Sequence, residues 1–174
     1  MSDLDNSRRD DIMKGRVRFR RATVRDLDVL IHQRRGMWSD MGVEDEGQLS
    51  GQDRVYRRWA RSRLKTGTLL AWVAETNEGI VVAGGTVWLR PTVPRPRTKQ
   101  MVQPFLLSMY TEPEWRGRGL ATRIVDEAIE WAKKNGYGEV LLHASRMGKG
   151  VYIRRGFKRT WEMKLELAMK PSRP

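Results

Sequence analysis

The sequence predicts a mixed α/β domain in which helices flank one central sheet. Three observations indicate this fold class. Apolar residues recur with strand and helix periods in the order β-α-α-β-β-β-α-β-α-β, and no internal repeat interrupts that order. A glycine-rich turn at 116–119 joins a strand-like run to a strongly helical run. The length of 174 residues is typical of one domain with a core of its own.

The first half of the chain alternates between strand and helix signals. Residues 1–14 are polar and lack apolar periodicity, so we expect a disordered leader followed by one domain over residues 15–170. Residues 17–21 alternate as a strand does, and Thr23 with Asp26 forms a capping-box pattern that begins a helix. An acidic loop is expected over 39–53 and a second helix over 54–65.

The second half supplies most of the predicted sheet. A four-residue turn at 76–79 separates two β-branched runs and predicts a hairpin, and a proline-containing basic connection follows at 91–99. The remaining elements are expected in this order: a strand over 102–111, a helix over 120–134, a fully buried strand over 140–142, a short helix over 150–154 and a half-buried strand over 161–167.

The composition of the chain argues against cysteine chemistry, a metal site and a membrane span. The chain has no cysteine, which excludes disulfides, a cysteine nucleophile and cysteine-based metal sites. Its two histidines, His32 and His143, are too few for a histidine-rich metal site, so we expect no metal. No apolar run approaches the ~20 residues that span a bilayer, and the N-terminus is polar. We therefore expect a cytoplasmic protein that does not bind membranes.

The net charge of +13 is the main argument for a nucleic-acid partner. The charge is scattered along the chain, however, and neither an RNA-binding aromatic signature nor zinc-finger spacing accompanies it. A nucleic-acid function is therefore disfavoured, although it stays open as a third class of function.

The turn at 116–119 has the features of a phosphate-binding loop. Two glycines let the backbone pass close to a ligand, and the helix that follows presents unpaired N–H groups and the positive end of its dipole. Arg116, Arg118 and Arg123 add positive charge. Neither a Walker loop nor a dinucleotide fingerprint fits, because no Gly-Lys-Ser/Thr follows and position 122 is Thr. The turn predicts a ligand that carries a diphosphate.

Two motifs in this order resemble those of one family. Arg116-x-x-Gly119-x-Ala121 fits the R/Q-x-x-G-x-G/A signature of the GCN5-related N-acetyltransferase (GNAT) family. About thirty residues later, the run from Ser145 to Phe157 is similar to a second signature of that family, Asn-x-x-Ala-x-x-Leu-Tyr-x-x-x-Gly-Phe. The resemblance covers roughly residues 16–168, and Ser145 departs from the usual Asn.

The resemblance implies a mostly antiparallel sheet in which two parallel central strands, ending near residues 111 and 144, splay apart around acetyl-CoA. It implies N-acetyltransferase activity, in which the acetyl group passes directly to a primary amine within a ternary complex. The residues implied in binding acetyl-CoA are Met109, Tyr110, Thr111, Arg116, Gly117, Arg118, Gly119, Leu120, Ala121, Thr122 and Ser145. A backbone N–H near Met109 would hold the thioester oxygen, and Tyr152 matches the tyrosine that protonates the departing thiolate.

The base that accepts the proton of the amine is less clear from the sequence. Alternate residues of the strand before the loop, Gln103, Phe105 and Leu107, carry no carboxylate. His143 is a candidate because an imidazole can accept a proton near neutral pH and because it shares a strand face with Ser145. Glu112, Glu75 or a chain of water molecules are the alternatives.

The acceptor amine is not identified by the sequence. In the family, the first two helices and their connection shape the acceptor site, and here Trp38, Asp40 and Glu44 are candidates to line it. The acidic loop favours a cationic amine, whereas the basic stretch at 90–99 favours an anionic acceptor. An alternative function is a GNAT-fold module that binds CoA with little or no catalysis, and a homodimer stays open.

Overall fold

The computed structural model describes residues 17–94, 96 and 100–167. The predicted leader, parts of the basic stretch at 95 and 97–99, and the last residues of the predicted domain lie outside these ranges. The elements are β1 (Val17–Arg21), η1 (Val24–Asp26), α2 (Leu27–Asp40), α3 (Glu46–Thr66), β2 (Leu69–Thr76), β3 (Val81–Pro91), β4 (Val102–Thr111), η2 (Pro113–Trp115), α4 (Leu120–Lys134), β5 (Leu141–Leu142) and α5 (Lys149–Arg154).

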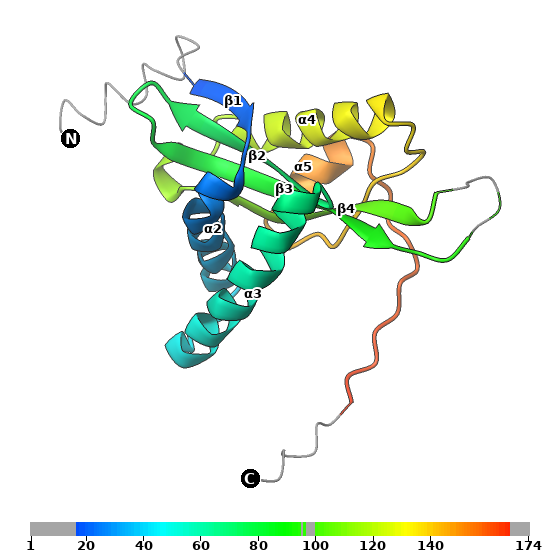
Figure 1. Cartoon of the computed structure of the whole chain (residues 1–174), viewed down its shortest axis with the longest axis horizontal. Coiled ribbons are helices and arrows are strands. Elements are labelled where there is room, and N and C mark those ends of the chain that lie inside the picture. Colours follow the sequence, from blue (N-terminus) through cyan, green and yellow to red (C-terminus); the bar gives the residue numbers. More distant parts are fainter. Residues whose placement is uncertain (1–16, 95, 97–99, 168–174) are drawn as a thin grey trace.

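The predicted fold class is confirmed, because a single mixed sheet lies between helices (Figure 1). The five strands follow the order β1-β2-β3-β4-β5, with antiparallel pairs up to β4 and a parallel pair between β4 and β5. Helices α2 and α3 cover one face, and α4 with α5 covers the other (Figure 1).

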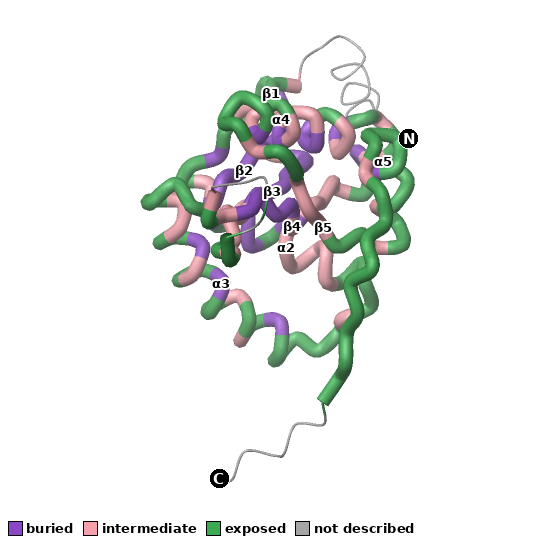
Figure 2. Tube along the Cα trace, turned by 90° about the vertical axis from the view of Figure 1, so that its right-hand side faces the viewer, coloured by how far each residue is buried: buried purple, intermediate pink, exposed green. Residues whose placement is uncertain are grey.

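The core is divided by the sheet into two apolar layers. On β2, Leu70 and Trp72 pack toward α4, whereas Leu69 and Ala71 pack toward α2 and α3. Because successive side chains of a strand point to opposite faces, β2 is buried on both sides. Buried positions accordingly gather on the central strands, as Figure 2 shows.

A β-bulge interrupts the pairing of β3 with β4. Leu107 pairs with Thr86 and Tyr110 pairs with Gly84, so Ser108 and Met109 together stand opposite Gly85. Ser108 takes a φ of 53°, in the left-handed region, and is the only described non-glycine residue with a positive φ. A Cβ on Gly85 would lie 2.2 Å from the Met109 sulfur and 3.0 Å from an Ile124 methyl carbon, so a larger residue here would displace the Met109 side chain. The extra residue bends β4 and redirects the strand that follows.

Three sequence predictions are corrected by the structure. Helix α3 begins at Glu46, because Asp45 caps it by accepting a hydrogen bond from the Gln48 N–H, so the loop predicted over 39–53 is helical from residue 46 onward. The strand predicted to be fully buried is a half-buried pair of residues at the edge of the sheet, β5.

The third correction concerns residues 161–167, for which alternation predicts a strand. The segment 158–167, called the C-terminal segment below, is exposed and unpaired, and it extends away from the sheet (Figures 1 and 2). Alternation describes which side chains share a face of an extended chain, but a strand also needs an edge to pair with. Among the described residues, the C-terminal segment pairs with no strand.

Candidate active site

A cleft of about 490 Å³ opens where β4 and β5 separate. The two strands pair only through Phe105 with Leu141 and Leu106 with Leu142, so the edge of β4 beyond the bulge has no strand beside it among the described residues. The cleft is lined by Met37, Asp40, Met41, Met109, Tyr110, Thr111, Trp115, Arg116, Gly117, Gly119, Leu120, Ala121, Thr122, Ser145, Met147, Gly148, Val151, Tyr152 and Arg154.

One end of this cleft is the turn that leads into α4. Gly117 and Gly119 have φ angles of 75° and 79°, and no side chain caps the helix. The N–H groups of its first turn are therefore available to an anion. The Arg116 Nε donates to the Thr111 carbonyl oxygen at 2.9 Å, and its Nη2 lies 2.7 Å from an Asp40 oxygen. Arg116 thus joins the turn to β4 and to the end of α2.

The middle of the cleft is formed by backbone. Met109, the second residue of the bulge, and the following Tyr110 and Thr111 line the cleft along their unpaired edge. A backbone edge of this kind can bind an extended ligand as a neighbouring strand would, through N–H and C=O groups. The aromatic ring of Tyr110 packs against Gly36 of α2, where a Cβ would lie 2.5 Å from the ring.

Tyr152 stands at the α5 side of the cleft. Its side chain is 8% exposed and makes an edge contact with the Phe157 ring, and burial raises the pKa of its phenol to about 12. The hydroxyl has no hydrogen-bond partner among the described residues. A phenol in this state stays protonated at neutral pH and is free to donate to a ligand.

The predicted residues are distributed unequally around the cleft. All the predicted acetyl-CoA residues line it except Arg118, whose guanidinium donates to the Glu114 carbonyl oxygen and stacks on Trp115. Ser145 lines it while accepting a hydrogen bond from the Gly148 N–H at 3.1 Å. Of the acceptor candidates Asp40 lines the cleft, whereas Trp38 lies under the Arg34 guanidinium and Glu44 is exposed.

The candidate bases lie outside the cleft. His143 is on the surface, where its Nε2 is 2.9 Å from a Glu162 oxygen. Glu75 is held by Arg20 and Arg18 at the β1 edge, and these bonds lower the pKa of its carboxyl to about 2. A carboxyl with so low a pKa is a poor proton acceptor.

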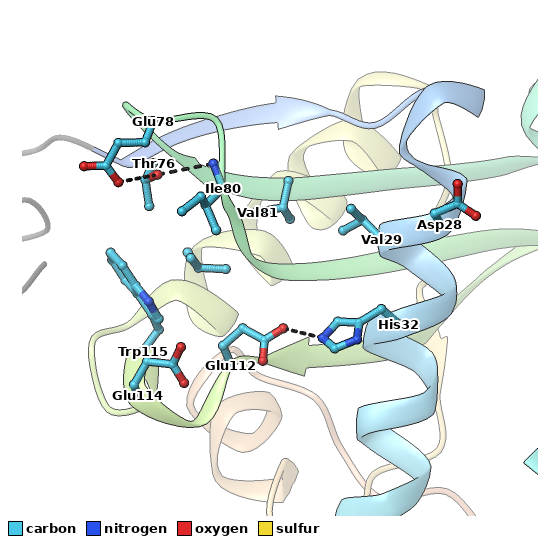
Figure 3. A pocket seen from close by; sticks show the side chains of 11 residues that line it. Asp28, Val29, His32, Thr76, Glu78, Ile80, Val81, Glu112, Glu114 and Trp115 are labelled. Atoms are coloured by element: carbon cyan, nitrogen blue, oxygen red, sulfur yellow. Dashed lines mark hydrogen bonds and ion pairs between the residues drawn. The ribbon is translucent and has the colours of Figure 1, made fainter. Parts of the chain in front are cut away.

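Glu112 faces a second pocket of about 370 Å³ on the other side of Trp115 (Figure 3). One Glu112 oxygen lies 2.9 Å from the His32 Nε2, and Figure 3 shows this pair below Val29 and Val81, with Trp115 to the side of Glu112. The pocket is rimmed by acidic side chains, and Trp115 is the one residue that also lines the cleft.

Several residues that line the cleft are not predicted from the sequence. Met37 and Met41 come from the end of α2, and Met147 and Val151 come from the segment around α5. The helical stripe of α2 marks which residues can face the sheet, but it does not show that the last turn reaches beyond the sheet to the cleft. Among the residues described, no group of acidic, histidine or cysteine side chains can hold a metal ion.

Comparison with known proteins places the chain in a family. A sequence model for the acetyltransferase (GNAT) domain matches residues 68–159, which include both motifs, the bulge and most of the residues that line the cleft. The chain therefore belongs to the GNAT acetyltransferase family.

Particular relatives agree with this assignment. The chain is 36% identical over 92 residues to N-acetyltransferase 8B of Homo sapiens and 34% identical over 92 residues to that of Rattus norvegicus. These matches cover 51% of this chain but only 38% and 39% of those proteins, so the chain spans less than half the length of the curated relatives it matches.

Solved structures match over most of the chain. One is a GCN5-related N-acetyltransferase from Ralstonia eutropha, with a TM-score of 0.79, 26% identity and coverage of 87% of this chain and 98% of that chain. Another is a predicted acetyltransferase from Clostridium acetobutylicum with acetyl-CoA, with a TM-score of 0.78, 30% identity and coverage of 87% and 96%.

Proposed function

We propose that this chain is an N-acetyltransferase that binds acetyl-CoA in the cleft and transfers its acetyl group to a primary amine. The observation that carries the proposal is the joint position of the uncapped α4 N-terminus, the free edge of β4 and the Tyr152 phenol along one cleft. The Clostridium acetobutylicum relative, which holds acetyl-CoA, supports the choice of ligand.

Each part of the cleft suits one part of acetyl-CoA. The N–H groups at the start of α4 suit the diphosphate, and the β4 edge from Met109 to Thr111 suits the amide-bearing pantetheine arm. The thioester then lies near the bulge, where a Met109 N–H can donate to its carbonyl oxygen. One such donor contributes ~3 kcal/mol to the transition state of acyl transfer.

The proposed reaction is a direct attack. The nitrogen of the neutral amine bonds to the thioester carbon, and the negative charge that develops on the carbonyl oxygen is stabilised by the Met109 N–H. The carbon–sulfur bond then breaks as the Tyr152 hydroxyl gives its proton to sulfur. The new amide nitrogen loses a proton, which restores the phenol through solvent.

Two proposals remain for the group that accepts the proton lost by the amine nitrogen. His143 is proposed as its acceptor through water, because the ring is open to solvent and His143 lies between β5 and Ser145. The competing proposal is that the amine binds in its neutral form and needs no side-chain base. His143→Ala decides between them, because only the first proposal predicts a loss of kcat/KM at neutral pH.

The alternative function is binding of CoA without turnover. It is favoured by one observation: the described carboxylates considered as bases, Glu75 and Glu112, both lie outside the cleft. A cytoplasmic location also stays a prediction, which fractionation of cells that produce the chain can test.

The test measures binding and turnover separately. Calorimetry with acetyl-CoA should show binding at one site, and a panel of primary amines should then release CoA. The chain has no cysteine, so any thiol that forms is free CoA. Absence of binding would overturn the proposal, and binding without thiol release for any amine would favour the non-catalytic alternative.

A further inference from the structure

A cluster of polar side chains lies on the α2 and α3 face of the sheet, directly beside the β4 bulge. The Arg34 Nη1 donates to the Ser108 hydroxyl at 3.2 Å, and the guanidinium carbon of Arg34 lies 4.6 Å from the centre of the Tyr56 ring. The Thr86 hydroxyl donates to the Leu107 carbonyl oxygen at 3.0 Å. We call Arg34, Tyr56, Thr86 and Ser108 the bulge cluster.

Arg34 lacks an anionic partner in the part of the chain that the structure describes. A guanidinium has five N–H donors, yet only the Ser108 hydroxyl accepts from it, and no described carboxylate lies within ion-pair distance. Asp53, which is near, pairs with Arg35 at 3.3 Å instead. Burial lowers the pKa of Arg34 because the charge is partly removed from water. A cation held in this way favours an anion from outside the chain.

Two further polar groups on this face of the sheet are buried. The Tyr56 hydroxyl lies close to the Ser108 and Thr86 hydroxyls, and burial raises the pKa of this phenol. Both amide atoms of Gln33 have no hydrogen-bond partner among the described residues, and Gln33 is 1% exposed. Buried polar atoms are nearly always satisfied in native proteins, so orphaned ones beside an unpaired cation indicate that a ligand completes the site.

The position of the cluster relates it to the proposed reaction. Ser108 directly precedes Met109, and consecutive Cα atoms are about 3.8 Å apart. An anion bound by Arg34 beside Ser108 would therefore lie on the α2 face of β4, next to the residue whose N–H is proposed to hold the thioester oxygen. An α-amino acid has its amine and its carboxylate on the same carbon, so it fits this spacing.

We propose that Arg34 binds the carboxylate of the acceptor, and that the acceptor is an α-amino acid or a derivative with a free carboxylate. The inference rests on the proposed acetyl transfer and adds the substrate class to it. It places the carboxylate against a planar pair of N–H donors, which suits bidentate binding.

The experiment compares acceptors that differ only at the carboxylate. For several α-amino acids, kcat/KM should exceed that of the corresponding amide and of the decarboxylated amine by about 10- to 100-fold, as expected for losing a charged hydrogen bond. Arg34→Met should remove this preference, mainly through KM, and Arg34→Lys should restore part of it. Arg35→Met is the matched control, since Arg35 pairs with Glu46 and Asp53.

The possible results separate the two proposals. Equal turnover of acid and amide by the native chain, or an unchanged preference in Arg34→Met, would overturn the carboxylate site while leaving acetyl transfer intact. If no amine is turned over, binding of N-acetylated amino acids and of their amides in the presence of CoA still decides the matter. Tighter binding of the acids that is lost in Arg34→Met supports the site, and equal binding refutes it.

A second inference comes from the C-terminal segment and is independent of the first. Its large apolar side chains occur at alternate positions, with Trp161 93%, Met163 94%, Leu165 82% and Leu167 76% exposed. The residues between them are Glu162, Lys164 and Glu166. In an extended chain such alternation gives one apolar and one charged face. A continuous apolar face of this size in water is typical of an interaction site.

The outer edge of β5 is a free strand edge with which the C-terminal segment can pair. β5 pairs only with β4, so its other side has no partner among the described residues. Glu162 of the segment pairs with His143, the residue that follows β5 in its own chain, and beyond that point the segment leads away from the sheet (Figure 1).

We infer that the C-terminal segment adds to the β5 edge of a second copy of this chain, and that the two copies exchange segments about a two-fold axis. Each copy carries both the strand and the edge, so reciprocal exchange closes the assembly and leaves neither unpaired. The exchange buries the apolar face of both segments. It also continues each sheet beyond β5.

Light scattering over a wide range of concentrations tests this inference. The native chain should be a dimer, and the double variant Met163→Glu, Leu165→Glu should be monomeric while still binding acetyl-CoA. Val55→Glu is the control, because Val55 is also apolar and exposed but lies on α3. A monomeric native chain, or a dimer that survives the double substitution, would overturn the inference. A monomer whose β5 amides resist hydrogen exchange would instead place the segment on its own sheet.

Discussion

Tyr152 combines two properties that a proton donor needs. It is buried enough that its pKa rises to about 12, and its hydroxyl has no partner among the described residues that would hold the proton elsewhere. The phenol therefore stays protonated at neutral pH and loses its proton only as the pH approaches that value.

Tyr152→Phe should lower kcat by about 100-fold or more, the usual contribution of a positioned general acid, and leave acetyl-CoA affinity nearly unchanged. Steady-state kinetics and calorimetry check the two parts. Tyr137→Phe serves as the control, because Tyr137 stacks on Trp131 outside the cleft. Native turnover in Tyr152→Phe would remove this residue from the reaction.

Gly119 has a backbone requirement that can be separated from ligand binding. Its φ is 79°, and Gly79 in the hairpin turn has a φ of 81°; a Cβ at either position meets no atom within 4 Å. An alanine at either site costs about 1–2 kcal/mol of stability through its left-handed backbone. Only Gly119→Ala should also weaken acetyl-CoA binding, because its methyl group enters the cleft. Equal affinities for the two variants, measured by calorimetry, would contradict the diphosphate assignment.

At the scale of elements, the close packing of α2 against β4 depends on one glycine, Gly36. A Cβ on Gly36 would lie 2.5 Å from the Tyr110 ring, and that ring lines the cleft. The position of the helix and the shape of the cleft are therefore coupled.

Gly36→Ala should destabilise the fold by about 1–3 kcal/mol, as overpacking does, and weaken acetyl-CoA binding as well. Gly51→Ala in α3 is the matched change, because nothing lies within 4 Å of the added Cβ there. It should stabilise the fold by up to ~1 kcal/mol through helix propensity. Denaturant unfolding measures both, and similar effects from the two substitutions would disprove the fit between Gly36 and Tyr110.

The sequence predicts most elements because their signals are local. The capping box of Thr23, the hairpin turn and the glycine after α4 each determine a boundary that the structure confirms. The start of α3 is missed because Asp45 and Glu46 look like part of an acidic loop, although an aspartate N-cap is also a helix signal. The strand predicted over 161–167 is wrong, because pairing depends on a distant edge rather than on the alternating residues themselves.

The cleft is predicted where backbone conformation or a motif carries the information. Gly117, Gly119 and Tyr152 are of this kind. The bulge cluster is not, because Arg34 and Tyr56 meet only after two helices pack on the same face of the sheet. Neither residue has a spacing in the sequence that distinguishes it from a helix-surface arginine or a core tyrosine.

At the scale of the whole molecule, the outer strand β1 is fixed by charge as well as by the ladder. Glu75 on β2 accepts hydrogen bonds from Arg18 and Arg20 of β1, and Arg20 also binds Asp26 at the start of η1. These bonds lower the pKa of Glu75 from its ordinary value of 4.5 to about 2.

A carboxyl whose folded pKa is depressed stabilises the fold above its unfolded pKa. We therefore expect this contribution in full above pH 4.5 and its loss as the pH falls from 4.5 to about 2. Glu75→Gln should be less stable than the native chain at neutral pH and should lose less stability across that window. Glu130→Gln, at an exposed position on α4, is the control. Parallel pH profiles for the native chain and Glu75→Gln would refute the assignment.

The bulge in β4 also changes how the strand should be aligned with those of its relatives. In an uninterrupted strand, residues 106 and 108 would share a face. Here Leu106 packs toward α4, whereas the Ser108 hydroxyl accepts from Arg34 on α2, and Met109 points back toward Ile124 on α4. The extra residue acts as a frame shift. An alignment that slips by one residue at Ser108 will therefore exchange the positions that face α4 with those that face α2 for the rest of the strand.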